Sequence, residues 1–523
     1  MIRLLPPGDP TVPDRDSCVL ELMLAERAAA TPDAVLVRYA DGTEWTYAQA
    51  LAEGRRAAGV FAAHGVGPGD AVLHWLPNGV EGVQVVLGCA LLGATVVPVN
   101  TALRGTVLAH VLRTSGARLL VAHRDLVDHL RGLEAPELLV AGEDWAAELA
   151  AATPWRGTSP REPWDPCAVL FTSGTTGPSK GVVTTSVQLY CVYTATPQFV
   201  DTPADRSLIT APFSHQVGLG TFYRAVLYGA SVALAPRFDT AAFWQTVAET
   251  GCTLATLVGG QATFLVHTDG PEPGAHTLRE VGGSPVTEDF LEFGRRFGVS
   301  LMTGFSMTEL SSPIMAAPGL PPGSCGRVRA GVQVRLVDDH DRDVPRGTPG
   351  ELVVRADRPW SLCTEYLGMP EATARAWRNG WFHTGDLLRE DEAGFYYFVD
   401  RAKDCIRRRG ENVSSFEVEC ELTAHPAVQA AAAVGVPGET GDQEVLAVLE
   451  LVEGAELDPA ELIEFLRPRL ANFMIPRYVR VVDVLPVTAS TRVRKEPLRA
   501  AGRTPDTWDR EAAGVRVRAD RFG

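Results

Sequence analysis

The sequence predicts an α/β protein with a large N-terminal domain and a small mobile α/β C-terminal domain. The large domain is expected to hold two βαβ-type subdomains and a small β-rich subdomain. Three observations predict this architecture. Helix-like and strand-like segments alternate over most of the chain. From about residue 331 short strands separated by turns replace this alternation, and a last α/β unit begins near Lys403.

The alternation is clearest in the first half of the chain. We expect helices at residues 48–64 and 82–92, and strands at residues 71–76, 95–99, 118–122 and 231–235. Such a series is typical of parallel strands whose connecting helices cover the faces of the sheet. The chain has 523 residues, too many for one core, so roughly two to four domains or subdomains are expected.

The second half differs in character. Short strands are expected at residues 332–337 and 351–355, with the turn 345–350 between them. The last unit is expected to hold helices at 415–424 and 459–470 and strands at 428–434 and 445–451. About 120 residues suffice for a small domain. We therefore predict an N-terminal domain of residues 1–402 and a C-terminal domain of residues 403–523.

Composition excludes several classes of partner. The net charge of -16 disfavours nucleic acids and anionic membranes, which would repel the chain. The longest apolar run, Val85–Val97, is too short to span a bilayer and is interrupted by Gly88 and Gly93. The nine cysteines are scattered, without the spacing of a metal site, and the N-terminus has no secretory pattern. These features predict a cytoplasmic protein with reduced cysteines.

Residues 168–171 form a short apolar strand that runs into the loop Thr172–Gly181. Its glycines let several backbone N–H groups converge on an anion, its hydroxyl groups add donors, and Lys180 adds a mobile positive charge. The loop lacks the Walker A pattern, because Lys180 precedes a glycine instead of following one. It therefore predicts a phosphate site of another kind, whose members are Thr172, Ser173, Gly174, Thr175, Thr176, Gly177 and Lys180.

Five short motifs follow the loop. They are Gly282–Pro285, Thr303–Glu309, Trp381–Asp386, Asp400–Asp404 and Arg409–Asn412. Their order and spacing resemble the adenylate-forming superfamily of acyl-CoA synthetases, carrier-protein adenylation domains and firefly-type luciferases. The resemblance covers nearly the whole chain, from Thr46 to Arg499. Within it, residues 408–414 look most like the acyl-CoA ligases, including those of the carnitine/crotonobetaine type.

The resemblance implies a role for each motif. Thr308 would contact the α-phosphate, and Glu309 would bind Mg²⁺, a hard cation that prefers carboxylate oxygen. Asp386 would accept both ribose hydroxyls. His215 would lie beside the carboxylate of the acid substrate, and Ser306 would face the acyl pocket. The remaining ATP-site residues implied are Gly283, Ser284, Pro285 and Met307, with Phe305 stacked on adenine and Arg401 near the ribose or phosphates.

The implied reaction has two steps. A small-molecule carboxylic acid attacks the α-phosphorus of ATP, pyrophosphate leaves, and an acyl-adenylate forms. The thiol of CoA then attacks the mixed anhydride. ATP, Mg²⁺ and CoA are therefore the expected cofactors. In the family the C-terminal domain rotates about a hinge between the two steps, and Lys403 matches that hinge.

One departure from the family pattern concerns the adenylation lysine near the C-terminus. Arg492 stands at its position, and Lys495 lies three residues further on. An arginine can pair with both carboxylate and phosphate, so we expect Arg492 to take this role. Lys495 in the same role, or an impaired adenylation step, are the alternatives.

A second departure lies beside the expected CoA tunnel, formed by Arg409, Gly410 and Glu411. Arg409 replaces a glycine there. Its side chain would either narrow the tunnel or contribute to a basic lip for the phosphates of CoA.

Two alternatives to CoA ligation remain open from the sequence. The adenylate of a carboxylic acid, or of an unusual oxyacid such as nitrite, would pass to a free-standing carrier protein, an amine or another nucleophile. A nucleotide-binding protein with impaired adenylation is the second alternative, because of Arg492. The sequence names neither the acid nor the oligomeric state, and both a monomer and a homodimer are compatible with it.

Overall fold

The computed structural model describes most of the chain. The described residues are 2–172, 178–195, 201–258, 261–284, 288–316, 321–401, 406–408, 411–413, 415–438, 442–486, 493 and 495–517. All structural statements below concern these residues.

The first predicted subdomain is a six-stranded sheet with the strand order β6-β5-β3-β4-β7-β8. Its parallel strands run from Glu137–Val140 (β6), Leu119–Ala122 (β5), Ala71–Trp75 (β3) and Thr95–Pro98 (β4) to Pro166–Thr172 (β7). The edge strand β8 (Lys180–Thr185) pairs antiparallel with β7. The expected phosphate loop therefore connects the two strands of a hairpin, whose base is the pair Thr172 and Lys180.

The second sheet combines the other predicted subdomains. Its parallel part contains β1 (Val35–Tyr39), β10 (Ser231–Leu234), β9 (Arg206–Ile209), β11 (Leu254–Val258), β12 (Glu280–Ser284) and β13 (Ser300–Phe305), with β2 (Glu44–Thr46) antiparallel at the edge. It continues through β14 (Ile314–Ala316), β15 (Ser324–Val328), β20 (Tyr396–Arg401), β19 (Trp381–Glu390), β17 (Gly350–Ala356) and β16 (Val332–Val337), while β18 (Trp377–Arg378) pairs with β19. The β-rich subdomain is thus an antiparallel extension of the parallel sheet.

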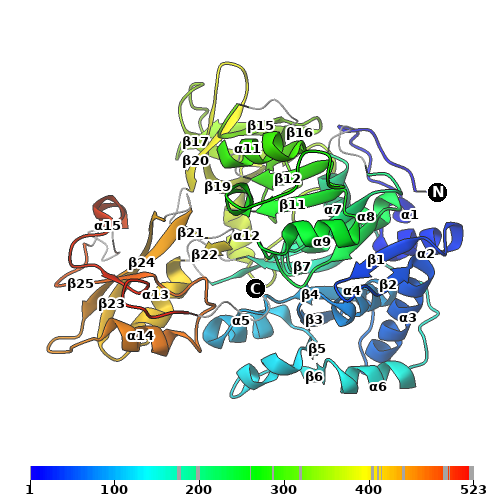
Figure 1. The fold of residues 1–523 in the computed structure, drawn as a ribbon, viewed down its shortest axis with the longest axis horizontal. Coiled ribbons are helices and arrows are strands. Elements are labelled where there is room, and N and C mark those ends of the chain that lie inside the picture. Colours follow the sequence, from blue (N-terminus) through cyan, green and yellow to red (C-terminus); the bar gives the residue numbers. More distant parts are fainter. Residues whose placement is uncertain are drawn as a thin grey trace.

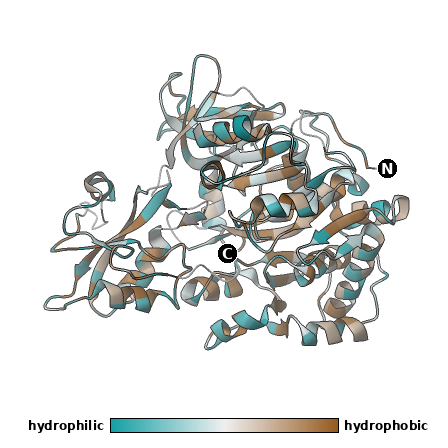
Figure 2. Cartoon of the chain, in the orientation of Figure 1, coloured by the Kyte–Doolittle hydropathy of each residue, from teal (hydrophilic) through white to brown (hydrophobic). Residues whose placement is uncertain are grey.

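Helices cover these sheets (Figure 1). They are α1 (Arg15–Cys18), α2 (Leu20–Ala30), α3 (Tyr47–Ala63), α4 (Val80–Leu92), α5 (Gly105–Ser115), α6 (Glu143–Ala151), α7 (Ser186–Tyr193), α8 (Gln216–Tyr228), α9 (Phe243–Thr250), α10 (Gln261–Val266), α11 (Glu288–Phe297) and α12 (Pro370–Ala376), together with the 3₁₀ helix η1 (Arg124–Leu130). In Figure 2 the apolar residues gather on the central strands and on α4, which is buried from Gly82 to Leu92.

The C-terminal part forms a separate lobe at the left of Figure 1. Its four-stranded sheet contains β23 (Val428–Pro437), β24 (Gln443–Leu451), β25 (Tyr478–Val482) and β26 (Trp508–Asp509), and β21 (Ile406–Arg408) pairs with β22 (Glu411–Val413). Its helices are α13 (Ser415–Thr423), α14 (Pro459–Leu466) and α15 (Lys495–Ala501). The expected α/β unit is present, although α14 ends four residues earlier than predicted. The expected boundary at residues 402–403 lies outside the described residues.

Two general features bear on the expectations from composition. In the part of the chain that the structure describes, no helix combines the length and the apolar character needed to cross a bilayer. All eight cysteines in that part are free thiols, and Cys405 lies outside it.

A close backbone contact fixes the turn that carries His215. Gly218, in the first turn of α8, packs directly on the segment before His215. A Cβ atom built at Gly218 would lie 2.3 Å from the carbonyl oxygen of Pro212 and 2.6 Å from that of Ala211. Since backbone atoms cannot swing aside as the end of a side chain can, only glycine fits here without moving the turn.

We expect Gly218→Ala to destabilise the protein by about 1–3 kcal/mol, the usual cost of overpacking. Chemical denaturation measures this change. The matched control is Gly67→Ala, where the nearest atom to the added Cβ lies 3.9 Å away. There the smaller entropy of the unfolded chain predicts a gain of about 0.4–1 kcal/mol. Equal stability of the two variants would show that the contact at Gly218 is not tight.

Candidate active site

Lys180 begins β8 and is held beside Tyr366, a residue from a distant segment. The Nζ atom of Lys180 lies 4.4 Å from the centre of the Tyr366 ring, the geometry of a cation–π contact. Backbone pairing holds the two segments together. Leu367 N donates to Gly181 O at 2.8 Å, and Val183 N donates to Glu365 O at 3.1 Å. Tyr366 is only 4% exposed, so its ring has little freedom to move.

The hydroxyl of Tyr366 extends the contact to the predicted Mg²⁺ ligand. It donates to Oε1 of Glu309 at 2.9 Å, and the carboxylate is 5% exposed. Among the described residues, no arginine, lysine or histidine forms an ion pair with Glu309. Burying a carboxylate without a cation costs free energy. The site therefore has the charge and the hard oxygen donor that a Mg²⁺ ion requires.

The backbone at Thr308 and Glu309 is fixed from two further sides. Gln188 of α7, which is fully buried, donates from Nε2 to the carbonyl oxygen of Thr308 at 2.8 Å. Cys363 N donates to the carbonyl oxygen of Glu309 at 2.8 Å. The predicted α-phosphate contact and the predicted metal ligand thus sit on a turn with little conformational freedom.

The adenine side is built at the ends of parallel strands. Gly283, near the end of β12, packs against Phe290, and a Cβ atom there would lie 2.5 Å from its ring. Phe305 ends the neighbouring strand β13 and is 7% exposed, within a hydrophobic cluster that also contains Leu310 and Tyr366. Ser306 is exposed and Met307 is partly buried. The backbone of Ser284 belongs to β12, whereas its side chain and Pro285 lie outside the description.

The two residues predicted at the ribose face each other across two strands. Asp386 of β19 pairs in register with Arg401 of β20. Asp386 is 2% exposed, so its carboxylate is shielded from solvent. The side chain of Arg401 is outside the description, but its position opposite Asp386 agrees with a shared role.

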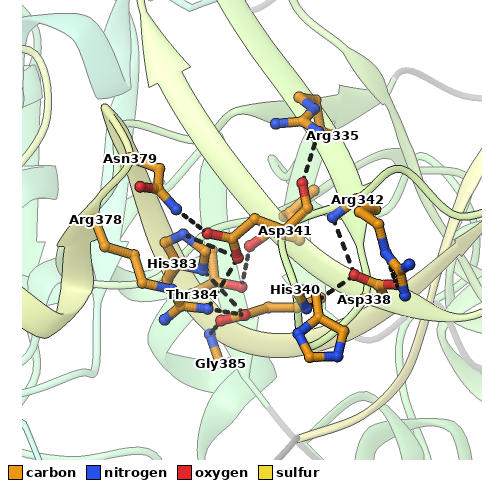
Figure 3. A network of polar contacts seen from close by, with 12 residues as sticks. Arg335, Asp338, His340, Asp341, Arg342, Arg378, Asn379, His383, Thr384 and Gly385 are labelled. Carbon is orange, nitrogen blue, oxygen red and sulfur yellow. Dashed lines mark hydrogen bonds and ion pairs between the residues drawn. The ribbon is translucent and has the colours of Figure 1, made fainter.

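A polar network braces residues 383–385 of β19, which precede Asp386 in the strand (Figure 3). Glu351 of β17 accepts from Gly385 N at 3.0 Å and lies 3.0 Å from Nδ1 of His383. Thr384 Oγ1 donates to Leu352 O at 2.7 Å. The glycine has a φ of 71°, which ordinary residues rarely adopt. The network therefore holds the backbone of β19 just before Asp386.

His215 immediately precedes α8 and caps it. Its Nδ1 accepts from Val217 N at 3.1 Å, and its backbone N donates to Pro212 O at 2.9 Å. Solvent reaches the side chain, yet desolvation by the surrounding protein lowers the pKa of the imidazole. Both facts fit a side chain on a concave surface, where a neutral imidazole can contact a substrate carboxylate without competing for its proton.

Lys495, one candidate for the adenylation cation, is held by two side chains of its own lobe. Its Nζ contacts Oε1 of Glu419 and Oγ of Ser415, both at 2.7 Å and both on α13. In Figure 1, α15 lies on the outer side of the C-terminal lobe. Glu411 opens β22 and is partly buried, opposite Arg408 of β21.

Several predicted residues lie outside the described residues, so their places are not stated. They are Ser173, Gly174, Thr175, Thr176, Gly177, Pro285, Lys403, Arg409, Gly410 and Arg492.

Three contacts in the site were not predicted from the sequence. Tyr366 and Gln188 touch predicted residues, but they come from segments without a recognised motif. Glu417 of α13 accepts a hydrogen bond from Ser179 Oγ in the phosphate loop. For Tyr366, the sequence offers one signal, its place shortly before the helix-start residues Pro370 and Glu371. That place does not by itself indicate a functional site.

The sequence matches two families of known proteins. Residues 24–367 match the AMP-binding enzymes, and residues 417–492 match the AMP-binding enzyme C-terminal domain. A feruloyl-CoA synthase from Amycolatopsis is 34% identical over 90% of this chain and 97% of its own length. The crotonobetaine/carnitine–CoA ligase of Salmonella agona is 31% identical over 87% of this chain and 93% of its own.

Two solved structures of one protein are also similar to this chain. They are forms of the o-succinylbenzoate CoA synthetase of Bacillus subtilis, 27% identical in both alignments. A double mutant bound to a CoA product analogue has a TM-score of 0.82, covering 92% of this chain and 98% of that one. The complex with AMP has a TM-score of 0.67, covering 91% and 97%.

The family match spans well over half of the chain, and the relatives align with it almost from end to end. The fold, with its large N-terminal part and smaller C-terminal lobe, agrees with this match. The chain belongs to the family of AMP-binding, adenylate-forming enzymes.

Proposed function

We propose that this protein is an ATP-dependent acid–thiol ligase. It activates a small carboxylic acid as the acyl-adenylate, releases pyrophosphate, and transfers the acyl group to the thiol of CoA. Relatives with 34% and 31% identity are named as CoA ligases, and they align over 90% and 87% of this chain. ATP, Mg²⁺ and CoA are the cofactors that this family implies.

The contact between Lys180, Tyr366 and Glu309 carries the proposal. It joins the end of the phosphate loop to the carboxylate expected to bind metal. Adenylation requires positive charge on the leaving pyrophosphate and on the reacting phosphorus at the same time. Lys180 would supply the charge beside the pyrophosphate, and Glu309 would hold the metal ion beside the reacting phosphorus. Tyr366 contacts both residues and so keeps them at a fixed distance.

The roles of the other residues follow from their places. Glu309 would hold Mg²⁺, which neutralises charge on the transferring phosphoryl group when bound. Thr308 would contact the α-phosphate, Asp386 and Arg401 the ribose, and Gly283, Phe305 and Met307 the nucleotide. Phe305 has little exposed surface here, so a stacked adenine would require the ring to present its remaining edge or to shift.

On the acid side, His215 would orient the carboxylate, and its lowered pKa keeps the imidazole neutral at pH 7. The acid carboxylate then attacks the α-phosphorus in line while pyrophosphate leaves toward Lys180. Ser306, which is exposed beside the turn, would shorten the acyl pocket or contact a polar substituent of the acid.

The arrangement of the two domains supports the assignment of this structure to the second step, the transfer of the acyl group to CoA. The fold resembles the product-analogue complex of the Bacillus synthetase more closely than the AMP complex of the same protein. Lys495 is bound to Glu419 of α13, as expected once adenylation is complete. We infer that residues 1–402 and 403–523 move as two domains about Lys403, and that Arg409, Gly410 and Glu411 border the CoA path.

Adenylation would require the C-terminal domain to bring a cation toward the phosphates. Arg492 remains our assignment for that cation, because Lys495 would first have to leave both Glu419 and Ser415. The free thiols of the described cysteines also favour a reducing compartment, so we place the protein in the cytoplasm.

The function is tested by a panel of aryl, short-chain and medium-chain acids. We expect acid-dependent pyrophosphate release, trapping of the adenylate by hydroxylamine, and consumption of CoA. Trapping without CoA consumption would show that the adenylate passes to an acceptor other than CoA, such as a carrier-protein thiol or an amine. Absence of acid-dependent pyrophosphate release across the panel would favour a nucleotide-binding protein.

We expect Lys180→Ala to weaken pyrophosphate binding and slow adenylation. Hydrogen bonds to charged groups contribute about 1.5–3 kcal/mol, which corresponds to roughly 10- to 150-fold in rate or affinity. Exchange between pyrophosphate and ATP measures the effect, and Lys180→Arg is the control that keeps the charge. A wild-type rate at saturating ATP with unchanged ATP affinity would contradict this role.

Two substitutions at Tyr366 separate the effect of its hydroxyl contact from the effect of its ring contact. Tyr366→Phe removes the hydroxyl that donates to Glu309 but keeps the ring under Lys180, whereas Tyr366→Leu removes both. Loss of a partner that orients a metal ligand typically weakens metal binding by about 10- to 100-fold. We expect Tyr366→Phe to need correspondingly more Mg²⁺ for thermal stabilisation by ATP, with little change in the stability of the ligand-free protein.

In Tyr366→Leu the binding of pyrophosphate alone should weaken as well, because Lys180 loses its aromatic neighbour. If both variants showed the wild-type Mg²⁺ dependence, Tyr366 would have no part in the metal site.

A further inference from the structure

A helix of the C-terminal lobe is docked on the phosphate loop. Glu417, in the first turn of α13, accepts a hydrogen bond at Oε1 from Oγ of Ser179. Both side chains are buried, with 6% and 5% of their surface exposed. On its other side Ser179 is held by α5, because Nε2 of His110 lies 2.8 Å from its carbonyl oxygen. The end of the phosphate loop is therefore enclosed between the two domains.

A second contact lies one helical turn further along the same face of α13. Glu421 accepts from Thr106 Oγ1 of α5, and Nη1 of Arg469 lies 3.1 Å from its Oε2. Gly105 packs on the backbone of Arg469, where a Cβ atom would lie 3.3 Å from its Cα. Residues four apart share one face of a helix, so Glu417 and Glu421 together define the docking face.

The chemistry of this interface conflicts with a loaded phosphate loop. Ser179 has one hydroxyl hydrogen, which it donates either to Glu417 or to a phosphate oxygen. A carboxylate buried beside the loop would also repel the charges of pyrophosphate, and burial weakens the screening of that repulsion. The docked C-terminal domain and bound pyrophosphate are therefore competing states of one site.

We propose that Glu417 is a positioning residue for thioester formation, which docks the C-terminal domain on Ser179 only after pyrophosphate has left the loop. The proposal rests on the proposed function only for the assignment of the loop to phosphate. Under this proposal, bound pyrophosphate prevents the C-terminal domain from docking. It also explains why Ser415 and Glu419 of the same helix hold Lys495, since one helix then docks the domain and withdraws the lysine.

Protonation adds a second control. Burial raises the pKa of Glu417 to about 7. The group that faces it from the N-terminal domain is Ser179, whose carbonyl oxygen contacts His110. Cys420 and Glu421 lie three and four residues further along its own helix. When the domain undocks, the carboxyl returns to its ordinary, lower pKa. The stabilisation of docking is therefore fully present below about pH 4.5 and is lost as the pH rises through about 7.

Hydrogen–deuterium exchange on the full chain, with inorganic pyrophosphate as the only ligand, tests the proposal. In the wild type, pyrophosphate should increase exchange in α13 and in the facing part of α5. Glu417→Ala should show the faster exchange without pyrophosphate and should bind pyrophosphate at least about 5-fold more tightly, the lower end of usual coupling between sites. Glu461→Ala, an exposed glutamate of α14, is the matched control and should match the wild type in both measurements.

Glu417→Gln separates positioning from a merely structural role. The amide oxygen can still accept from Ser179, so exchange in α13 should return to the wild-type level at pH 6. Without pyrophosphate, the wild type should lose protection of α13 between about pH 6 and 8, and Glu417→Gln should not.

Three results would overturn the proposal. They are wild-type exchange that pyrophosphate leaves unchanged, a Glu417→Ala variant that matches the wild type, and a pH dependence that survives in Glu417→Gln, which would assign the titration to another group. None of these measurements requires an acid substrate. They therefore remain informative if the panel of acids finds no adenylation.

Discussion

The candidate active site depends on one residue, Tyr366, which contacts Lys180 with its ring and Glu309 with its hydroxyl. The rest of the site is arranged so that this contact is maintained. Backbone hydrogen bonds join residues 365–367 to β8, and Gln188 and Cys363 fix the turn at Thr308 and Glu309. The expected phosphate loop and the carboxylate expected to bind metal, which come from different subdomains, thereby keep a constant separation, which electrostatic stabilisation of a transition state requires.

Most of the fold could be predicted because it depends on local patterns. The helices and strands expected between residues 48 and 122 are all present within about two residues. Asp386 and Arg401 were assigned to one ribose site from separate motifs, and the register of β19 and β20 places them opposite each other. The β-rich subdomain was predicted in content, but its continuity with the parallel sheet depends on the pairing of β13 with β14, which no periodicity encodes.

The residues that sequence reasoning missed share a physical cause. Tyr366 lies 186 residues from Lys180, and their contact follows from an isolated backbone bridge between Tyr366 and Val182 of β8. Glu417 stands in an acidic helical stretch, a pattern that normally indicates a solvated face. The burial of Glu417 depends on contact with another domain, so the composition and spacing of residues within α13 cannot predict that burial. The roles assigned to all the site residues remain predictions, and Ser173–Gly177, Arg409 and Arg492 also lie outside the description.

Two of the missed residues, Tyr366 and Glu417, suggest how one site serves two steps. Tyr366 is fully enclosed in the N-terminal domain and joins groups that must stay together throughout the cycle. Glu417 belongs to the C-terminal lobe and contacts the loop at the end opposite Thr172. A buried carboxylate beside a phosphate loop is costly while the loop is occupied, and acceptable once it is empty. Tyr366 therefore couples the residues of the nucleotide site permanently, whereas Glu417 couples the C-terminal domain to that site only in one state. The first keeps the nucleotide site assembled, and the second ties the movement of the C-terminal domain to the charge that remains in that site.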